Sequence, residues 1–312
     1  MKIIRTTETA GPRVLALGTF DGVHRGHQEL IRLGKKLAEE SGALLRVCTF
    51  DRHPLEILSP DRAPSRLTTA EEQAELMEQY GADELRVIPF SRETAETEPE
   101  AFLRLLRREC GLSAVVAGWN YTFGRGGRGN AGLLQSEGTR AGYRALIVPS
   151  VKTAAGEVIS STAVRQKLIR GDADGARELL GYPYRITGPV VNGKHQGSRI
   201  GFPTANIQYE EKKQLPAFGV YVCRLISGRE AWNAVVNIGI QPTIPSGKVT
   251  VEVHTMDANP DLYGKEVRAE ILTRLRGEIR FSCAGELAEQ IRRDREKAAA
   301  WFREHTDRTD AR

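Results

Sequence analysis

Apolar segments of strand length alternate with amphipathic segments of helix length along the first half of the chain. The strand-like "RVLALGTF", which begins at Arg13, precedes the helix-like "QELIRLGKKLAEE". The strand-like "ALLRVCTF" and "LRVIPF" enclose the helix-like "EEQAELMEQY", and "PEAFLRLLRREC" precedes the buried-strand run "AVVAGWN". Such alternation is typical of parallel strands joined by crossover helices. The first half is therefore predicted to be an α/β domain with a doubly wound parallel sheet.

The second half has short strand-like runs separated by Gly, Pro and Asn. These runs are "RITGPVV", "GVYVCRLI", "WNAVVNIGI", "VTVEVHTM" and "VRAEILTRL", and their spacing predicts a small antiparallel β-barrel. Two short helices broken at Gly171 are predicted before the barrel, and we place the domain boundary between them and the barrel, giving domains 1–182 and 183–312. A terminal helix is predicted to pack on the barrel through Leu287, Ile291, Ala298 and Phe302.

Composition and charge narrow the class of protein only in part. The 312 residues include 45 Lys and Arg against 40 Asp and Glu, which favours anionic partners without separating small phosphates from nucleic acid. No apolar run is long enough to span a membrane, and "MKIIRTTETAGPR" lacks the apolar core of a signal peptide, so we expect a cytoplasmic protein with no membrane partner. The four cysteines have no metal-ligand or redox spacing and are expected to be buried and reduced.

The stretch "GTFDGVHRGH" lies between the first predicted strand and the first predicted helix. An open parallel sheet binds ligands at this edge, where the free N–H groups and the dipole of a helix N-terminus attract anions. Glycines allow the backbone to approach a phosphate, and two histidines three residues apart can donate hydrogen bonds to it. The candidate phosphate-binding residues are Gly18, Phe20, Asp21, Gly22, His24 and His27.

Two other interpretations of this stretch stay open at the level of its residues. Asp21 and Gly22 can form a plain turn followed by half-exposed histidines at a helix start. A metal site would need further ligands, and Asp21 and His53 form no recognised zinc spacing with the two histidines.

Two stretches that follow other strands carry candidates for binding a planar ring. His53 and Pro54 in "TFDRHPLEIL" follow the second predicted strand, although a simple turn is the alternative. In "AGWNYTFGRGGRGN", Asn120, Tyr121 and Phe123 can hydrogen-bond and stack on a ring. The Gly-Arg tail of that stretch suits a mobile loop as well as a phosphate cradle.

The stretch "ISSTAVR" carries a second set of candidate phosphate ligands. Ser160, Ser161 and Thr162 are predicted at a helix N-cap, with Arg165 one turn further on. Plain helix capping is the alternative function of these residues.

In the second half, a glycine-spaced basic loop and a "PTAN" segment are candidates for handling phosphate and magnesium. Gly193, Lys194 and Gly197 can fold around phosphates, although such a loop is weak evidence alone. Thr204 and Asn206 offer neutral oxygens suited to magnesium with bound phosphates, and a turn is the alternative.

The strand "VTVEVHTM" alternates so that the valines face one way and Thr250, Glu252 and His254 face the other. Glu252 is thereby free to accept a proton or to meet solvent.

Together these motifs resemble a known family. "GTFDGVHRGHQ" and "ISSTAVR" resemble the two signatures of the nucleotidylyltransferase superfamily, whose fold is Rossmann-like. "TFDRHP" and "AGWNYTFGRGGRGN" narrow the resemblance to the bacterial bifunctional riboflavin kinase/FMN adenylyltransferases, also called FAD synthetases. The order of "GFPTANI", "GVYVCRL", "VVNIGIQPTI", "VEVH" and "DLYGKEV" is similar to that of the family's riboflavin kinase module, a six-stranded barrel.

The resemblance implies a role for each candidate. In the first domain, FMN would attack the α-phosphorus of ATP and release pyrophosphate, with Asn120, Phe123, His53 and Pro54 at the flavin. The residues implied at ATP there are Gly18, Phe20, Asp21, Gly22, His24, His27, Ser160, Ser161, Thr162 and Arg165, of which His24, His27 and Arg165 would be catalytic.

In the second domain, the resemblance implies transfer of the γ-phosphoryl group of ATP to riboflavin. Glu252 would be the base that deprotonates the ribityl 5'-hydroxyl, Thr204 and Asn206 would bind Mg²⁺, and Gly193, Lys194 and Gly197 would bind ATP. The implied small molecules are ATP, riboflavin, FMN and FAD.

The chain departs from the family pattern at two places. Asn120 stands where many members have Asp. "QPTI", Gln241 to Ile244, replaces the frequent Arg-Pro-Thr-Phe near the expected flavin side, which predicts changed affinity. Arg276, Glu278 and Phe281 keep the spacing of the segment that closes over flavin, and the sequence assigns them no role.

Three other functions remain to be compared with this one. An enzyme with a single activity would use the other domain as a scaffold, and the barrel could be a flavin-sensing regulatory module. A nucleic-acid-binding protein would use the basic balance and "GRGGRG", but the chain lacks clustered bases interleaved with aromatic residues, so we expect no nucleic-acid partner. The oligomeric state does not follow from the sequence.

Overall fold

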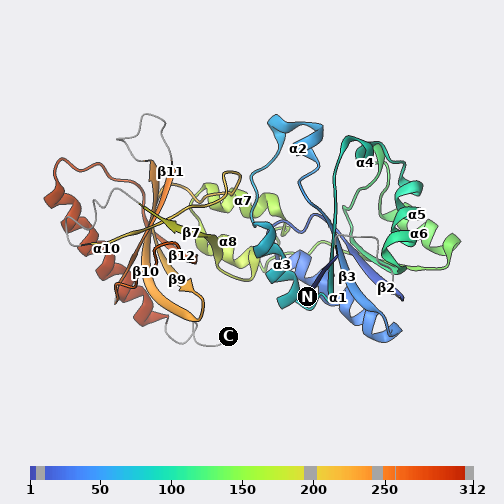
Figure 1. Ribbon diagram of the computed structural model, residues 1–312, viewed down its shortest axis with the longest axis horizontal. Coiled ribbons are helices and arrows are strands. Elements are labelled where there is room, and N and C mark those ends of the chain that lie inside the picture. Colours follow the sequence, from blue (N-terminus) through green and yellow to red (C-terminus); the bar gives the residue numbers. More distant parts are fainter. Residues whose placement is uncertain (5–10, 193–201, 241–248, 257, 306–312) are drawn as a thin grey trace. The chain divides into compact units, whose positions relative to one another are not determined.

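The computed structural model describes residues 1–4, 11–192, 202–240, 249–256 and 258–305 (Figure 1). The chain divides into two compact units, Met1–Ser161 and Thr162–Arg312. The first unit is an α/β sheet structure and the second contains a closed barrel, which confirms the predicted fold class.

The first unit is built on a six-stranded parallel sheet in the order β1-β4-β3-β2-β5-β6. The central strands are buried on both faces, which explains their continuous apolar sequences. The strands are β1 (Lys2–Ile4), β2 (Arg13–Leu17), β3 (Leu44–Phe50), β4 (Glu84–Ile88), β5 (Leu112–Gly118) and β6 (Arg144–Val148).

Helices cover both faces of this sheet. One face packs on α5 and α6 through a core that includes Phe102, Leu106 and Leu134. The other face packs on α1 so closely that a Cβ at Gly34 would lie 2.8 Å from the Leu45 side chain of β3. Figure 1 shows α3 on the same side of the sheet as α1. The helices of this unit are α1 (Arg25–Ser41), α2 (Leu55–Leu58), α3 (Ala70–Gln79), α4 (Arg92–Glu96), α5 (Pro99–Cys110) and α6 (Ala131–Ala141), with the 3₁₀ turns η1 (Pro60–Arg62) and η2 (Arg125–Gly127).

The second unit contains a closed six-stranded barrel in the order β10-β11-β8-β7-β12-β9. Each strand pairs antiparallel with both of its neighbours, and β9 pairs with β10 to close the barrel. Its strands are β7 (Tyr184–Val191), β8 (Ala205–Ile207), β9 (Gly219–Ser227), β10 (Glu230–Ile240), β11 (Val249–Thr255) and β12 (Glu266–Arg276). Its helices are α7 (Ser161–Ile169), which begins at the last residue of the first unit, α8 (Ala173–Leu180) and α10 (Ala284–Glu304).

The terminal helix α10 covers one outer face of the barrel, as its apolar stripe predicts. Ala298 and Phe302 pack in a cluster with Val220 and Val222 of β9 and Leu272 of β12. The other two residues of the predicted stripe, Leu287 and Ile291, are only partly buried.

Two details differ from the sequence analysis or add to it. Cys283 is exposed, so the prediction that all four cysteines are buried is wrong for this residue, which precedes α10. The helices α7 and α8 group with the barrel in the compact unit, whereas the functional boundary between residues 182 and 183 stays a prediction.

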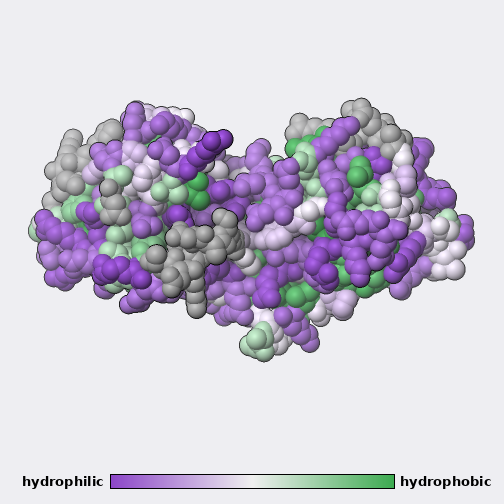
Figure 2. Space-filling model, turned by 90° about the horizontal axis from the view of Figure 1, so that it is seen from below, coloured by the Kyte–Doolittle hydropathy of each residue, from purple (hydrophilic) through white to green (hydrophobic). Residues whose placement is uncertain are grey.

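The surface of the described residues is mainly hydrophilic, and apolar side chains form small separate groups on the face that Figure 2 shows. No helix among these residues is long and apolar enough to cross a membrane.

Candidate functional site

The turn between β2 and α1 has a constrained backbone. Phe20 and Val23 have positive φ angles of 52° and 33° although neither is glycine, and Gly22 has a φ of 80°. Such conformations cost free energy and occur preferentially at functional sites. Phe20 is fully buried, and a Cβ at Gly18 would lie 3.1 Å from its ring, so a larger residue at position 18 would crowd it.

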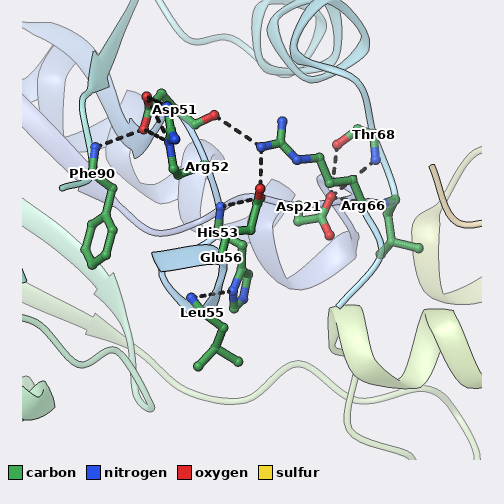
Figure 3. A network of polar contacts seen from close by, with 10 residues as sticks. Asp21, Asp51, Arg52, His53, Leu55, Glu56, Arg66, Thr68 and Phe90 are labelled. Atoms are coloured by element: carbon green, nitrogen blue, oxygen red, sulfur yellow. Dashed lines mark hydrogen bonds and ion pairs between the residues drawn. The ribbon is translucent and has the colours of Figure 1, made fainter. Parts of the chain in front are cut away.

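Asp21 anchors this turn to the segment before α3 (Figure 3). Its Oδ1 accepts hydrogen bonds from the backbone N–H groups of Leu67 and Thr68 at 2.9 and 3.2 Å, and from the Thr68 hydroxyl at 3.3 Å. The same hydroxyl accepts the N–H of Gly22 at 3.2 Å. The carboxylate therefore holds the turn in place, and its expected contact with ATP stays a prediction.

The two histidines of the motif are stacked at the start of α1. His24 is the N-cap residue, and its Nδ1 accepts the N–H of His27 at 3.3 Å. The ring centroids lie 3.7 Å apart with an angle of 14° between the planes. Because Nδ1 of His24 accepts, the proton of the neutral ring lies on Nε2.

His27 is neutral at pH 7. Burial lowers the pKa of His27 well below its usual value, and the neighbouring His24 lowers it further. A neutral imidazole can still donate a hydrogen bond to a phosphate, so the predicted role does not need a charged ring.

The second signature lies beside this turn. The Ser161 hydroxyl donates to the backbone oxygen of Asp21 at 2.8 Å, which joins segments 140 residues apart. A Cβ at Gly26 would lie 3.1 Å from the His24 ring and 3.7 Å from the carbonyl oxygen of Ile159. Ser160 precedes Ser161 directly, whereas Thr162 and Arg165 follow on α7 in the second unit, and their contacts with ATP stay predictions.

A cavity that the sequence analysis missed lies next to the N-terminus of α1. Its volume is about 560 Å³, and its lining includes Arg25, Gln28 and Leu33 of α1 together with Tyr80, Pro149 and Val151. Arg25 stands between the two histidines in the sequence, but nothing in the sequence pattern pairs it with the segment after β6.

His53 lies in a hydrogen-bonded loop after β3 (Figure 3), and Pro54 follows it as the N-cap residue of α2. Nδ1 of His53 accepts the N–H of Leu55 at 3.2 Å, and the N–H of His53 donates to Glu56 at 3.1 Å. Arg66 donates to the same oxygen of Glu56 at 2.9 Å. The loop is thereby ordered from within, and a flavin contact of His53 and Pro54 stays a prediction.

The segment after β5 presents a different aromatic residue from the expected one. Phe123 is 5% exposed and packs on Tyr121 and Phe102 in the core, so its ring is mostly used by the fold. Asn120 is exposed, and Trp119 beside it is 55% exposed. The sequence pattern does not single out Trp119, although an exposed tryptophan suits stacking on a planar ring.

The arginines of "GRGGRG" are paired with carboxylates. Arg128 lies 2.5 Å from Glu98, and Arg125 lies 3.2 Å from Glu96. These ion pairs join η2 and the residue after it to the end of α4 and to the segment between α4 and α5, so the tail is an ordered loop.

In the barrel, Glu252 and Asn206 are direct partners across β11 and β8. Directly opposite residues in an antiparallel pair have neighbouring side chains on one face of the sheet. Val251 and Val253 are each 1% exposed, which confirms the predicted alternation and places Glu252 on the outer face. Thr204 directly precedes β8, so the two expected magnesium ligands lie at the start of this strand.

Two residues without an assigned role are now explained. Arg276 forms an ion pair of 2.8 Å with Asp294 of α10, which is 2% exposed, so it joins β12 to the helix. Glu278 accepts the N–H of Ile240 at 3.3 Å at the end of β10. Phe281 is only partly buried. Gly193, Lys194, Gly197 and Gln241 to Ile244 lie outside the described residues.

The donor set at β8 and β11 fits a magnesium ion with bound phosphates, because it offers hard neutral oxygens beside a carboxylate. Three or more His, Cys, Asp or Glu side chains do not gather into a metal-binding group anywhere in the described residues.

A parallel sheet with a histidine turn at a helix N-terminus, followed by a separate barrel with a carboxylate beside neutral oxygens, defines a two-part enzyme that acts on phosphate compounds. The comparisons with known proteins agree. The family model for FAD synthetase matches residues 6–163, and the model for riboflavin kinase matches residues 180–302. The chain belongs to the family of the bifunctional riboflavin kinase/FMN adenylyltransferases.

Individual relatives match over almost the full length. The bifunctional riboflavin kinase/FMN adenylyltransferase of Bacillus subtilis is 35% identical over 95% of this chain and 94% of the relative, and that of Escherichia coli K12 is 35% identical over 93% and 92%. A solved structure described as a macrolide-efflux protein from Streptococcus pneumoniae has a TM-score of 0.87 and 31% identity over 96% of this chain and 98% of its own.

Proposed function

We propose that each half of this bifunctional enzyme carries one of two consecutive reactions. The barrel phosphorylates riboflavin to FMN with ATP, and the α/β half transfers the adenylyl group of a second ATP to FMN, which gives FAD and pyrophosphate. The observation that most supports the adenylyl-transfer site is the hydrogen bond from Ser161 to Asp21, because it joins both signature segments at the N-terminus of α1.

For adenylyl transfer, the residues act by positioning and by stabilising charge. The FMN phosphate oxygen attacks the α-phosphorus in line, and the bond to the β-phosphate oxygen breaks as pyrophosphate leaves. In our proposal His24 and His27 donate from Nε2 to phosphate oxygens, the N-terminus of α1 adds its dipole, and Arg165 neutralises the leaving group. Gly18, Gly22, Ser160 and Thr162 line the path of the triphosphate.

The cavity beside α1 suits the base of ATP. Its volume of about 560 Å³ lies within the range of small-molecule sites, and Arg25 borders it directly after His24. A triphosphate at the histidines would place its nucleoside close to this cavity. We therefore propose that Tyr80, Pro149 and Val151 contact the adenosine.

For riboflavin phosphorylation, we propose Glu252 as the base that accepts the proton of the ribityl 5'-hydroxyl. The oxygen then attacks the γ-phosphorus, and ADP leaves. Thr204 and Asn206 would hold Mg²⁺, which screens the charge of the phosphates when bound. The register that pairs Glu252 with Asn206 supports this arrangement.

A chromatographic time course tests the two-step function. Purified full-length protein receives riboflavin, ATP and Mg²⁺, and samples are quenched at intervals. We expect FMN to appear first and FAD to follow. If riboflavin is not converted but supplied FMN gives FAD, the barrel lacks the kinase activity and the single-activity interpretation replaces ours.

Three accompanying predictions concern the setting of the enzyme. We propose that the protein works in the cytoplasm and needs no nucleic-acid or membrane partner. Cell fractionation tests the location, and an RNA-binding titration at two salt concentrations tests the partner, because binding to RNA phosphates weakens steeply with salt.

A further inference from the structure

A histidine with no assigned role holds the segment that carries the proposed magnesium ligands. Nδ1 of His254 lies 2.8 Å from the carbonyl oxygen of Pro203, the residue directly before Thr204. The ring of His254 also meets the ring of Phe202 edge to face, at a centroid distance of 5.5 Å and an angle of 80°. Two consecutive residues before the ligands therefore contact one imidazole.

The chemistry of the acceptor gives the direction of this hydrogen bond. Burial lowers the pKa of His254, the Pro203 carbonyl partly opposes this shift, and Arg295 lowers the pKa again, so the ring is neutral at pH 7. A carbonyl oxygen can only accept, so Nδ1 carries the proton and donates the hydrogen bond to the Pro203 carbonyl. Nε2 is buried and has no hydrogen-bond partner.

A second side chain holds the same segment from α10. The guanidinium carbon of Arg295 lies 5.9 Å from the centroid of the Phe202 ring, and its Nη2 donates to the carbonyl oxygen of Met256 at 2.6 Å. Arg295 is thereby tied to the chain just beyond β11 while it covers Phe202. The segment before β8 is thus contacted by β11 and by α10.

The short strand β8 needs such support. It has three residues, of which Ala205 and Asn206 pair with β11, and residues 202–204 directly before it belong to no regular element. His254 lies two positions after Glu252 on the same face of β11. One strand therefore carries both the proposed base and the side chain that fixes the segment with the metal ligands.

We infer that His254 is a positioning residue of the kinase site, whose Nδ1–H holds the Pro203 carbonyl and so sets Thr204 and Asn206 at the correct distance from Glu252. This inference rests on the proposed function of the barrel. His254 does not touch substrate, and its loss should weaken the binding of Mg²⁺ and ATP more than it slows the chemical step.

Three variants of the full-length enzyme test the inference. His254→Asn keeps an N–H donor near the place of Nδ1, His254→Phe keeps a ring without a donor, and His254→Gln places its donor near Nε2 instead. We expect the Phe and Gln variants to raise two quantities about fivefold to tenfold: the Mg²⁺ concentration for half-maximal riboflavin phosphorylation, and the KM for ATP. This factor corresponds to the free energy of one lost hydrogen bond. The kcat should change less than twofold, and Asn should restore wild-type values to within about twofold.

Two further readouts separate positioning from a loss of folding. The rate of FAD formation from supplied FMN, which belongs to the other half of the chain, should be unchanged in all three variants. Hydrogen exchange of the peptide 202–207, measured without any ligand, should be faster in the Phe and Gln variants and of wild-type rate in the Asn variant. If the Phe variant unfolds the barrel, the Gln variant carries the comparison.

The outcomes distinguish this inference from the proposed function. The variant Asn206→Ala should also raise the Mg²⁺ requirement. If it does so while His254→Gln and His254→Phe leave both the Mg²⁺ requirement and the exchange of peptide 202–207 unchanged, the positioning role is wrong and the proposed function stands. If Asn206→Ala leaves the Mg²⁺ requirement unchanged, the proposed metal ligands are wrong.

Discussion

Replacing Asp21 tests whether its carboxylate binds ATP or holds the turn. Asp21→Ala removes the acceptor of three hydrogen bonds, from two backbone N–H groups and the Thr68 hydroxyl, which share one oxygen. Hydrogen bonds contribute about 1 kcal/mol each and more when the acceptor is charged. Because the three share one partly exposed carboxylate, we expect Asp21→Ala to lower the free energy of unfolding of the α/β half by about 2–4 kcal/mol.

The matched variant Asp21→Asn keeps a carbonyl oxygen where the carboxylate oxygen lies, so its loss should be about 1 kcal/mol. Hydrogen exchange of peptides from β2 and β3, followed at increasing urea concentration, measures the stability of this half alone. FAD formation from supplied FMN should stay within about threefold of wild type in Asp21→Asn and fall more than tenfold in Asp21→Ala, because about 1.4 kcal/mol of lost positioning is a factor of ten.

The rate of FMN formation from riboflavin is the control and should be equal in both variants. One result refutes the reasoning: Asp21→Asn lowers FAD formation as strongly as Asp21→Ala while its stability matches wild type. The negative charge would then act on ATP or its metal ion, as the sequence resemblance implies.

Three further predictions follow from the structure. The pKa of His27 is lower in the folded than in the unfolded chain, so the unfolded chain binds more protons and the α/β half should lose stability as the pH falls from 7 through the unfolded pKa toward the folded one. His27→Gln should reduce this loss, which urea titrations at pH 7 and pH 5 measure. An equal pH dependence of stability in both proteins would contradict the lowered pKa of His27. Phe302→Ala should destabilise the barrel by about 3 kcal/mol in denaturant unfolding, and a change below about 1 kcal/mol would show that α10 does not complete its core. Arg276→Ala leaves the buried Asp294 without its ion-pair partner and should cost about 3 kcal/mol, whereas the double variant with Asp294→Ala should recover part of that loss.

The sequence predicts the buried parts of the fold better than its edges. Strands β2 and β5 carry apolar runs because both of their faces are covered, and β3 carries such a run interrupted by the buried Arg46 and Thr49. The sequence analysis does not predict the edge strand β6, which is mostly only half-buried although Ala145 to Val148 are all apolar. It also does not predict α6, whose interior includes Gly132 and Gly138.

The sequence motifs predict where the candidate site lies, but the structure gives some residues of these motifs a different role. Asp21 looked like a ligand because it stands inside the phosphate motif, but its hydrogen bonds to residues 67 and 68 depend on a tertiary contact that no local pattern shows. Phe123 lies in the motif that predicts binding of a planar ring, but its side chain is buried in the core, whereas Trp119 is exposed. His254 shares a face with Glu252 in the sequence pattern, but only the folded barrel brings its ring to Pro203.

The division of labour between the two halves is tested most directly by measuring both reaction rates in Glu252→Gln and His27→Ala. FMN formation from riboflavin and FAD formation from supplied FMN are followed separately in the full-length chain, with thermal unfolding to confirm that each variant is folded. We predict that Glu252→Gln lowers the rate of FMN formation at least about a hundredfold, a size typical of removing a general base, and keeps FAD formation. His27→Ala should lower the rate of FAD formation and keep FMN formation. If either folded variant loses both activities, the two reactions share a site and the account of two separate centres is wrong.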